Sequence, residues 1–289
     1  MTIREKGYFH WDGALEERRL PWAPVTRQGL RLAFKRKGFK FLYFGAFVPA
    51  IAFLIGVYIS ERIGEFRYWL RGSPTLFEVN PAFFKTYYTS EFLLFVMVML
   101  MVVGGAGLIS DDLRHNALQL YFSRPLDKRG YLVGKASVLV VLLLSITLVP
   151  GLAFVLFKLL FSGSFSFVVT YPWIVLSILA CSAAVTAFFC LYTLLLSSLS
   201  RNRRYVSILL FAVYFVSDIV FGIFYRNFKK PGFALLSLKA NLQQTGAFLF
   251  RQKLPYDVPA GWSFLILAVF GAAAWIVVNR KVRSVEVVK

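Results

Sequence analysis

Six long apolar runs divide this 289-residue chain and constrain its fold more than any other feature. They are Phe39–Ile59, Phe92–Ile109, Tyr131–Leu160, Trp173–Leu199, Tyr205–Tyr225 and Trp262–Asn279. A helix needs about 17–25 apolar residues to cross the hydrocarbon of a bilayer, and each run is at least that long. The sequence therefore predicts an all-α membrane protein with six transmembrane helices. Pro49 is expected to kink the first helix, and Pro150 is expected to break the third.

A polar segment precedes the first run, and its second half, Thr26–Gly38, has the pattern of an amphipathic helix. Arg27, Arg31 and Lys35 recur every four residues, with apolar side chains on the adjoining face. Such a helix would lie along the membrane surface, with its basic side chains among the lipid head groups. The expected parts are a cytoplasmic N-terminal segment, 1–38, a six-helix transmembrane domain, 39–281, and a cytoplasmic tail, 282–289.

Basic residues set the expected orientation of the helices. With both termini in the cytoplasm, the segments on that side hold about twice as many Lys and Arg residues as the opposite side. The basic stretch 226–261 counts against this orientation, but long loops weigh less in the rule. The formal net charge of +19 would favour nucleic acid in a soluble protein. Here the basic residues flank apolar runs, so we expect no nucleic-acid partner.

The chain offers little for catalysis or metal binding. Cys181 and Cys190 lie nine residues apart in one run, on opposite sides of a helix, and cannot pair within it. Residues 130–136 imitate a phosphate loop, but the spacing is one residue short and Ala136 replaces the hydroxyl ligand of Mg²⁺. A membrane-enzyme site around His115 is a weaker interpretation, since acids at a helix mouth are more often caps. We expect no enzyme activity, no metal site and no cofactor bound by this chain.

The segment between the second and third runs, residues 110–135, carries the most informative pattern. Asp111 and Asp112 suit the N-terminus of a short helix, where acidic side chains meet the helix dipole. Arg124 precedes Pro125, and the residue before proline avoids the α region, so the short helix should end there. The polar surface of this helix would be presented by Arg114, His115, Gln119 and Tyr121.

This segment resembles the first cytoplasmic loop of ABC-2 type (type V) ABC-transporter permeases. That loop has an acidic residue, a short helix, a Ser/Arg-Pro turn, a basic residue and a hydrophobic-Gly-Lys entry into the third helix. The matching residues here are Asp111, Asp112, Leu118, Ser123, Arg124, Pro125, Arg129, Leu132, Gly134 and Lys135. The usual Gly-Thr of the short helix is replaced by Asn116 and Ala117. The resemblance extends to the six-helix layout and to the amphipathic helix before it.

The resemblance implies that roughly residues 112–122 form a coupling helix, which docks in a cleft of a separate ATP-binding subunit. The residues that this role assigns to the contact are Asp112, Arg114, His115, Leu118, Tyr121, Phe122 and Arg124. ATP and Mg²⁺ would bind to that partner subunit. The further partners implied are a second permease, either another copy or a paralogue, and the lipid bilayer of the cell inner membrane, with an extracytoplasmic protein as an additional candidate.

Three functions are compatible with the sequence. The preferred one is the permease subunit of an ATP-driven exporter. The second is a mechanotransmitter of the same fold, which drives an extracytoplasmic partner without moving a substrate. The third is a secondary, ion-coupled transporter, which would call for an inverted repeat and more intramembrane carboxylates than the sequence shows.

Asp218 is an acidic residue deep within an apolar run. An aspartate at the centre of a membrane helix costs about 2.5–3.5 kcal/mol, and the thirteen Val, Leu, Ile and Phe residues of Tyr205–Tyr225 offset it with about 4–8 kcal/mol. The segment should insert, with Asp218 facing the bundle or a partner. A pathway or pairing role and a simple hydrogen bond to a neighbouring Ser or Tyr are both open. Phe233–Phe250 is interpreted as a solvated amphipathic loop, in preference to an interfacial or re-entrant helix.

Overall fold

The computed structural model describes residues 20–62, 79–122 and 126–282, and over these the chain is helical with no strand. Six helical segments are long and apolar enough to cross a membrane, which confirms the predicted fold class. The first combines α2 (Lys37–Gly45) with α3 (Val48–Glu61); the second combines α5 (Pro81–Thr89), α6 (Glu91–Leu100), η2 (Met101–Gly105) and α7 (Gly107–Arg114). The others are α9 (Lys128–Ser162), α11 (Ile174–Leu199), α12 (Arg203–Phe228) and α14 (Ala260–Lys281). Shorter elements are α1 (Ala23–Phe34), α8 (Ala117–Phe122), α10 (Ser166–Thr170), η3 (Pro231–Leu236) and α13 (Leu238–Leu249).

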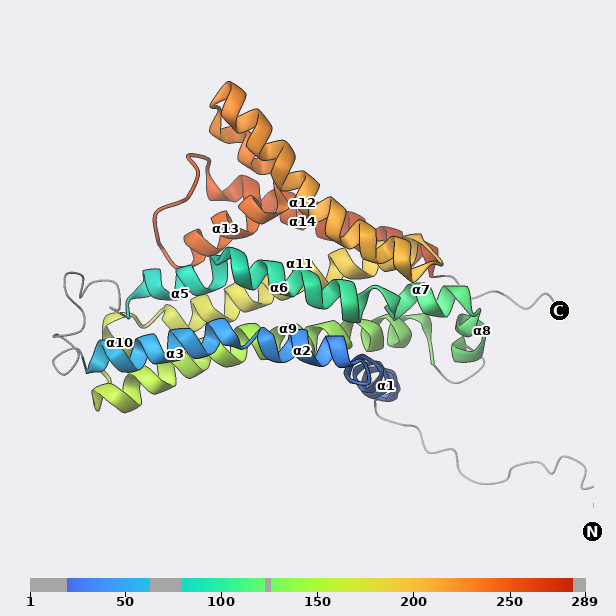
Figure 1. Cartoon of the computed structure of the whole chain (residues 1–289), viewed down its shortest axis with the longest axis horizontal. Coiled ribbons are helices and arrows are strands. Elements are labelled where there is room, and N and C mark those ends of the chain that lie inside the picture. Colours follow the sequence, from blue (N-terminus) through green and yellow to red (C-terminus); the bar gives the residue numbers. More distant parts are fainter. Residues whose placement is uncertain (1–19, 63–78, 123–125, 283–289) are drawn as a thin grey trace, which may run out of the picture.

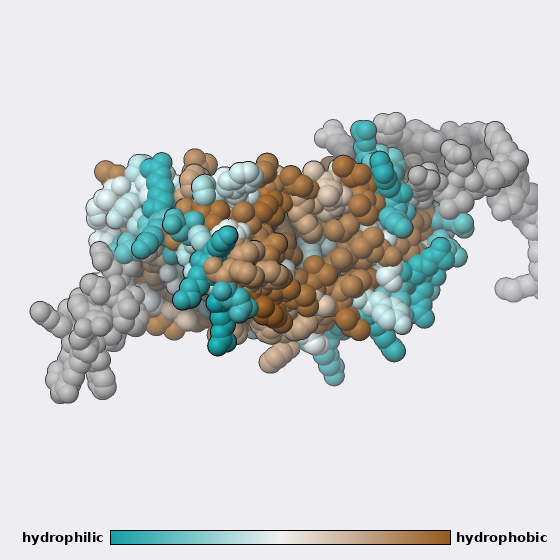
Figure 2. Space-filling view, turned by 90° about the horizontal axis from the view of Figure 1, so that it is seen from above, coloured by the Kyte–Doolittle hydropathy of each residue, from teal (hydrophilic) through white to brown (hydrophobic). Residues whose placement is uncertain are grey.

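The spans form an elongated bundle in which α9 and α11 are central (Figure 1). The helices α1, α7 and α8 gather at one end of the bundle. Toward the other end, the C-terminal part of α12 leans away from the remaining helices. Apolar side chains cover much of the middle of the face seen from above, with polar side chains to either side (Figure 2). This distribution is typical of a protein whose middle faces lipid or other apolar surfaces.

Two prolines have different effects on their helices. The first span is interrupted just before Pro49, where α2 ends and α3 begins, so the predicted kink is confirmed. The prediction that Pro150 breaks the third span is wrong, because α9 is continuous through it. Pro150 has no N–H for the carbonyl of Ile146, four residues earlier. The hydroxyl of Tyr87 donates to that oxygen at 2.7 Å, so the lost backbone bond is replaced from α5.

The amphipathic segment is helical, but its boundaries differ from the prediction. Thr26–Gly38 was expected as one helix, whereas α1 ends at Phe34 and α2 starts at Lys37. Helix α1 lies across the first turns of α9 at the α8 end (Figure 1). The Thr26 hydroxyl donates to the Gly134 carbonyl at 3.1 Å, and a side chain at Gly29 would come within 2.5 Å of Val138. Small residues therefore allow this close crossing.

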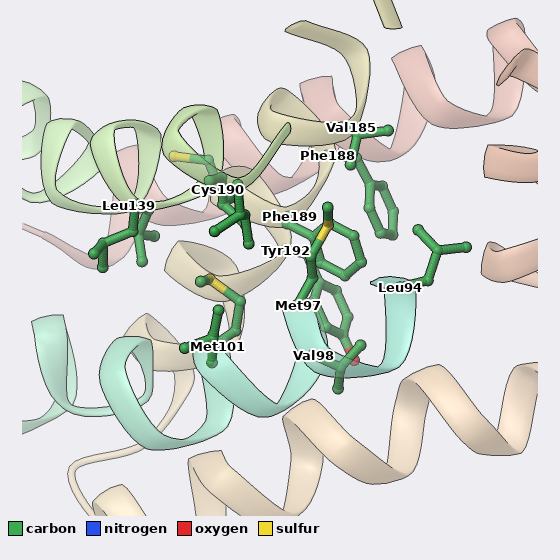
Figure 3. Close-up of a cluster of buried hydrophobic side chains, with 14 of the residues drawn as sticks. Leu94, Met97, Val98, Met101, Leu139, Val185, Phe188, Phe189, Cys190 and Tyr192 are labelled. Carbon is green, nitrogen blue, oxygen red and sulfur yellow. The ribbon is translucent and has the colours of Figure 1, made fainter. Parts of the chain in front are cut away.

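The core is a continuous apolar cluster between the second, third and fourth spans. Figure 3 shows Met97, Val98 and Met101 of the second span directed toward Phe189 and Tyr192 of α11. The opposite face of α6 is left exposed, as the side chains of Phe92 and Phe95 show.

The interpretation of Phe233–Phe250 as a solvated loop is wrong. The segment contains η3 and α13, and α13 packs against α5, α11, α12 and α14. Polar side chains that were read as solvent-facing are buried, among them Asn241, Gln244 and Thr245. Gln244 forms hydrogen bonds with the backbone of the loop that follows α13. Its Nε2 donates to the carbonyls of Tyr256 and Val258 at 3.0 and 2.6 Å. Hydrogen bonding to backbone made these amides compatible with burial, which composition alone did not reveal.

Candidate functional site

The turn between the second and third spans consists of two helices that meet at Asn116. The second span continues to Arg114, beyond the predicted end at Ile109, and α8 begins at Ala117. Asn116 has a φ of 51°, a left-handed conformation that asparagine tolerates better than most residues. The prediction that Asp111 and Asp112 start the short helix is therefore wrong, because both lie in the last turns of α7. A hydropathy pattern cannot separate a helix that projects into water from the loop after it.

Asp112 connects α7, which enters the turn, to α9, which follows it. Its Oδ2 lies 2.6 Å from Nζ of Lys135 and accepts a hydrogen bond of 2.7 Å from the hydroxyl of Tyr131, both on α9. The ring of Tyr121 on α8 lies 5.3 Å from that of Tyr131, and the Lys135 ammonium lies 5.6 Å from the Tyr121 ring centre. Burial, and then the Asp112 carboxylate, raise the pKa of Tyr121, so its hydroxyl stays protonated. These contacts fix α7 and α8 on the entry of α9.

The residues that sequence reasoning assigned to one contact surface point in different directions. Leu118 is only 8% exposed and packs into the core of its own chain. Asp112 and Tyr121 face α9, as described above. Arg114 and His115 are exposed, and His115 Nδ1 lies 2.8 Å from the Asp111 carbonyl. The side chain of Phe122 and the whole of Arg124 lie outside the described residues, so the structure leaves their assignment as a prediction.

A side chain from the fourth span secures the start of α7. The Ser197 hydroxyl accepts hydrogen bonds from the backbone N–H groups of Ile109 and Ser110 at 3.0 and 3.1 Å, and it donates to the Ala106 carbonyl at 2.9 Å. These bonds lie just after the π-helical turn η2, where the regular pattern of helical hydrogen bonds changes. Sequence reasoning missed this site.

The π-helical turn also frees carbonyl groups toward the neighbouring spans. Arg36, at the start of α2, donates to the Val103 carbonyl at 3.0 Å, and Arg203, at the start of α12, donates to the same oxygen. Ser207 donates to the Val102 carbonyl at 3.3 Å. The first, second and fifth spans therefore meet at one backbone turn. A Gly-Gly pair at 104 and 105 inside an apolar run was the signal for it, since such pairs accompany helix irregularities.

The six spans of the fold agree with the comparison with known families. A family model described as ABC-2 family transporter protein matches residues 5–259. This chain belongs to the ABC-2 transporter family. It is thus a membrane permease component of an ABC transporter, with multiple spans. The comparison with curated proteins gave no match for this ABC-2 permease.

Asp218 of the ABC-2 permease is held by α13 on the side away from α7. Its Oδ1 accepts a hydrogen bond of 3.0 Å from the hydroxyl of Ser237, and its Oδ2 lies 2.7 Å from Nζ of Lys239. Lys239 also lies 3.0 Å from Oε1 of Glu91, at the start of α6. The expected bond to a neighbouring serine is present, and Lys239 adds an ion pair that the sequence did not predict. Within the described parts of the chain, no group of three or more His, Cys, Asp or Glu side chains is placed to hold a metal ion.

Proposed function

We propose that this ABC-2 permease couples ATP hydrolysis by a separate ATP-binding subunit to export across the cell inner membrane. The observation that carries the proposal is the rigid turn formed by α7 and α8. It is attached to two spans at once, through the Asp112–Lys135 ion pair and through Ser197. The turn is continuous with the second span, so a displacement of α8 would move the second, third and fourth spans together.

The same end of the bundle supports a cytoplasmic assignment for the turn. Helix α1 and the end of α14 lie at this end (Figure 1), and Lys128 beside the turn donates to the Asn279 carbonyl. An excess of basic residues on one side favours the cytoplasm, so we place both termini there. The exposed face of the α1 helix, with Arg27 and Arg31, would then meet anionic head groups.

The assembly we propose has two permeases, identical or paralogous, and two ATP-binding subunits that bind ATP and Mg²⁺. The contact with the ATP-binding subunit would use the exposed polar side chains of the turn, chiefly Arg114, His115 and Gln119. Leu118 would support this contact indirectly, because it packs α8 against the core of the same chain. Substrate would move between the two permeases as the turns shift.

Negative charge introduced on the exposed side of the turn tests this proposal. Arg114→Glu and Gln119→Glu should reduce the amount of ATP-binding subunit that copurifies with the permease, and should reduce its stimulated ATPase activity. Lys229→Glu makes a matched charge reversal at the other end of the bundle, where the side chain is also exposed, and should leave both measurements unchanged. An intact complex with full ATPase stimulation in both turn variants would refute the docking role.

A mechanotransmitter is the second candidate, and the outer end of α12 favours it. Residues 222–230 are exposed on all sides, including Lys229 and Lys230, and this end stands clear of the bundle in Figure 1. A basic, exposed helix end is suited to contact with an acidic extracytoplasmic protein. Crosslinking from a cysteine placed at Lys229 in intact cells would distinguish the two. Capture of an extracytoplasmic protein in an ATP-dependent manner supports the mechanotransmitter, and its absence during active export supports the exporter.

A further inference from the structure

A groove of about 360 Å³ runs between α6 and α12, with α13 at one end. Its charged residues are Glu91 from α6, Asp218 from α12 and Lys239 from α13. Lys239 bridges the two carboxylates, at 3.0 Å from Glu91 and 2.7 Å from Asp218. Two carboxylates and one ammonium give the cluster a formal charge of −1. The ammonium therefore leaves one negative charge uncompensated inside the groove.

The walls of the groove are aromatic. Phe92 and Phe95 project from the face of α6 opposite to the core, and their side chains are 54% and 40% exposed. Phe215 of α12 lies across from them, with its ring centre 6.0 Å from that of Phe95 in an edge-to-face arrangement. Aromatic faces attract cations as well as apolar groups, so these walls complement the negative charge at the end of the groove.

A polar atom of the groove is left without a partner. Tyr214 is 2% exposed and lines the groove, and its hydroxyl makes no hydrogen bond to any described residue. A buried hydroxyl without a hydrogen-bond partner costs about 1–3 kcal/mol. Native proteins therefore rarely keep one unless a ligand or a water molecule supplies that partner. The hydroxyl oxygen can accept a hydrogen bond from a ligand N–H group.

Glu91 brings a carboxylate to the rim of the groove. It is the first residue of α6 and directly precedes the apolar run that starts at Phe92. Its side chain is 77% exposed. A carboxylate facing hydrocarbon is costly, and such residues almost always face a water-filled cavity or a protein neighbour.

We infer that this groove binds the substrate, and that the substrate is an organic cation with an aromatic or apolar body. The cation lies at Glu91 and Asp218, and the apolar body lies between Phe92, Phe95 and Phe215, beside Tyr214. The inference rests on the proposed export function, because only a transporter would need the groove to be filled and emptied. The Lys239 ammonium is already paired with both carboxylates, so it is not available to bind an anion.

Two probes of the same shape and opposite charge test the inference. Tetraphenylphosphonium and tetraphenylborate differ in charge but hardly in size, so partition into detergent can be separated from recognition of charge. We expect saturable binding of tetraphenylphosphonium to the purified full chain, and no saturable binding of tetraphenylborate. Glu91→Gln should weaken tetraphenylphosphonium binding about tenfold, because it removes the uncompensated charge. Lys239→Gln should strengthen it.

Controls separate the groove from other causes. Asp257→Asn removes an exposed carboxylate that does not line the groove, and it should leave the affinity unchanged. Thermal unfolding of each variant checks that the fold is retained, and Glu91, being exposed, should tolerate the change. Equal binding of the two probes, or an unchanged affinity in Glu91→Gln, would overturn the inference. Loss of ATP-binding subunit copurification tests the proposed function separately, because probe binding needs only this chain.

Discussion

Nζ of Lys135 lies 2.6 Å from Oδ2 of Asp112, and the two side chains are 9% and 15% exposed. The pair connects the last turns of the second span to the first turns of the third. It receives a further hydrogen bond from Tyr131, so the carboxylate is compensated on two sides. Such a connection makes the turn between the spans stiff, which a coupling element requires.

Breaking this ion pair from one side should destabilise the permease. Lys135→Met leaves the Asp112 carboxylate buried with only the Tyr131 hydroxyl, and we expect a loss of about 2–4 kcal/mol in the free energy of unfolding. The double variant with Asp112→Asn should lose less than Lys135→Met alone, because no unpaired charge remains. Denaturation of the purified chain in detergent measures both. Equal losses in the single and double variants would contradict the interpretation.

Ser197→Ala should loosen the start of α7 without affecting the rest of the bundle. The change removes the hydroxyl that accepts from the N–H groups of Ile109 and Ser110, and the loss of these bonds should cost about 1–3 kcal/mol. Hydrogen exchange should accelerate at these two amides. The neighbouring Ser198→Ala is the control, since its hydroxyl donates only to the Leu195 carbonyl of its own helix. A similar acceleration in both variants would show that the effect is not specific to Ser197.

The bond between Tyr87 and Ile146 predicts a coupling with Pro150. Tyr87→Phe removes the hydroxyl that replaces the backbone bond proline cannot make, and should cost about 1–3 kcal/mol. In a Pro150→Ala background the alanine N–H can reach the Ile146 carbonyl, so Tyr87→Phe should cost less there. A double-mutant cycle on unfolding free energies gives the coupling energy directly. A coupling energy of zero would mean that the two residues act independently.

Two glycines of the bundle should respond in opposite ways to alanine. A Cβ at Gly104 would overlap the ring of Phe39, so Gly104→Ala should destabilise by about 1–3 kcal/mol and disturb the π-helical turn. Gly45 has open space around it, so Gly45→Ala should be neutral or stabilise by up to about 0.5 kcal/mol. Thermal unfolding of the two variants provides the comparison. A tolerated Gly104→Ala would show that Phe39 can move aside freely.

Hydropathy predicted the number of spans but not their lengths. Six apolar runs were sufficient because crossing a bilayer requires a minimum apolar length for each helix. The second span is longer than predicted at both ends, from Pro81 to Arg114, since helices continue into water wherever capping and packing allow it. Pro49 acted as expected, whereas Pro150 did not, because the outcome depends on whether another side chain reaches the freed carbonyl.

The candidate turn could be located from the sequence, but the direction of its side chains could not. The pattern around Asp112, Arg124 and Pro125 placed the turn between the second and third spans. The break at Asn116 depends on one backbone angle, and that break rotates Leu118 inward. A helical periodicity drawn through the break therefore assigns faces incorrectly.

The sequence by itself determined the membrane class, the six spans and the family, because these depend on apolar length and on a local motif. Only the tertiary structure decided which charges meet. Lys239 is separated from Glu91 by about half the chain, so no local pattern could pair them. Arg36 and Arg203 are still further apart in sequence, yet both donate to the Val103 carbonyl. Their contacts arise from the packing of distant helices, which the hydrophobic effect drives without specifying partners in the sequence.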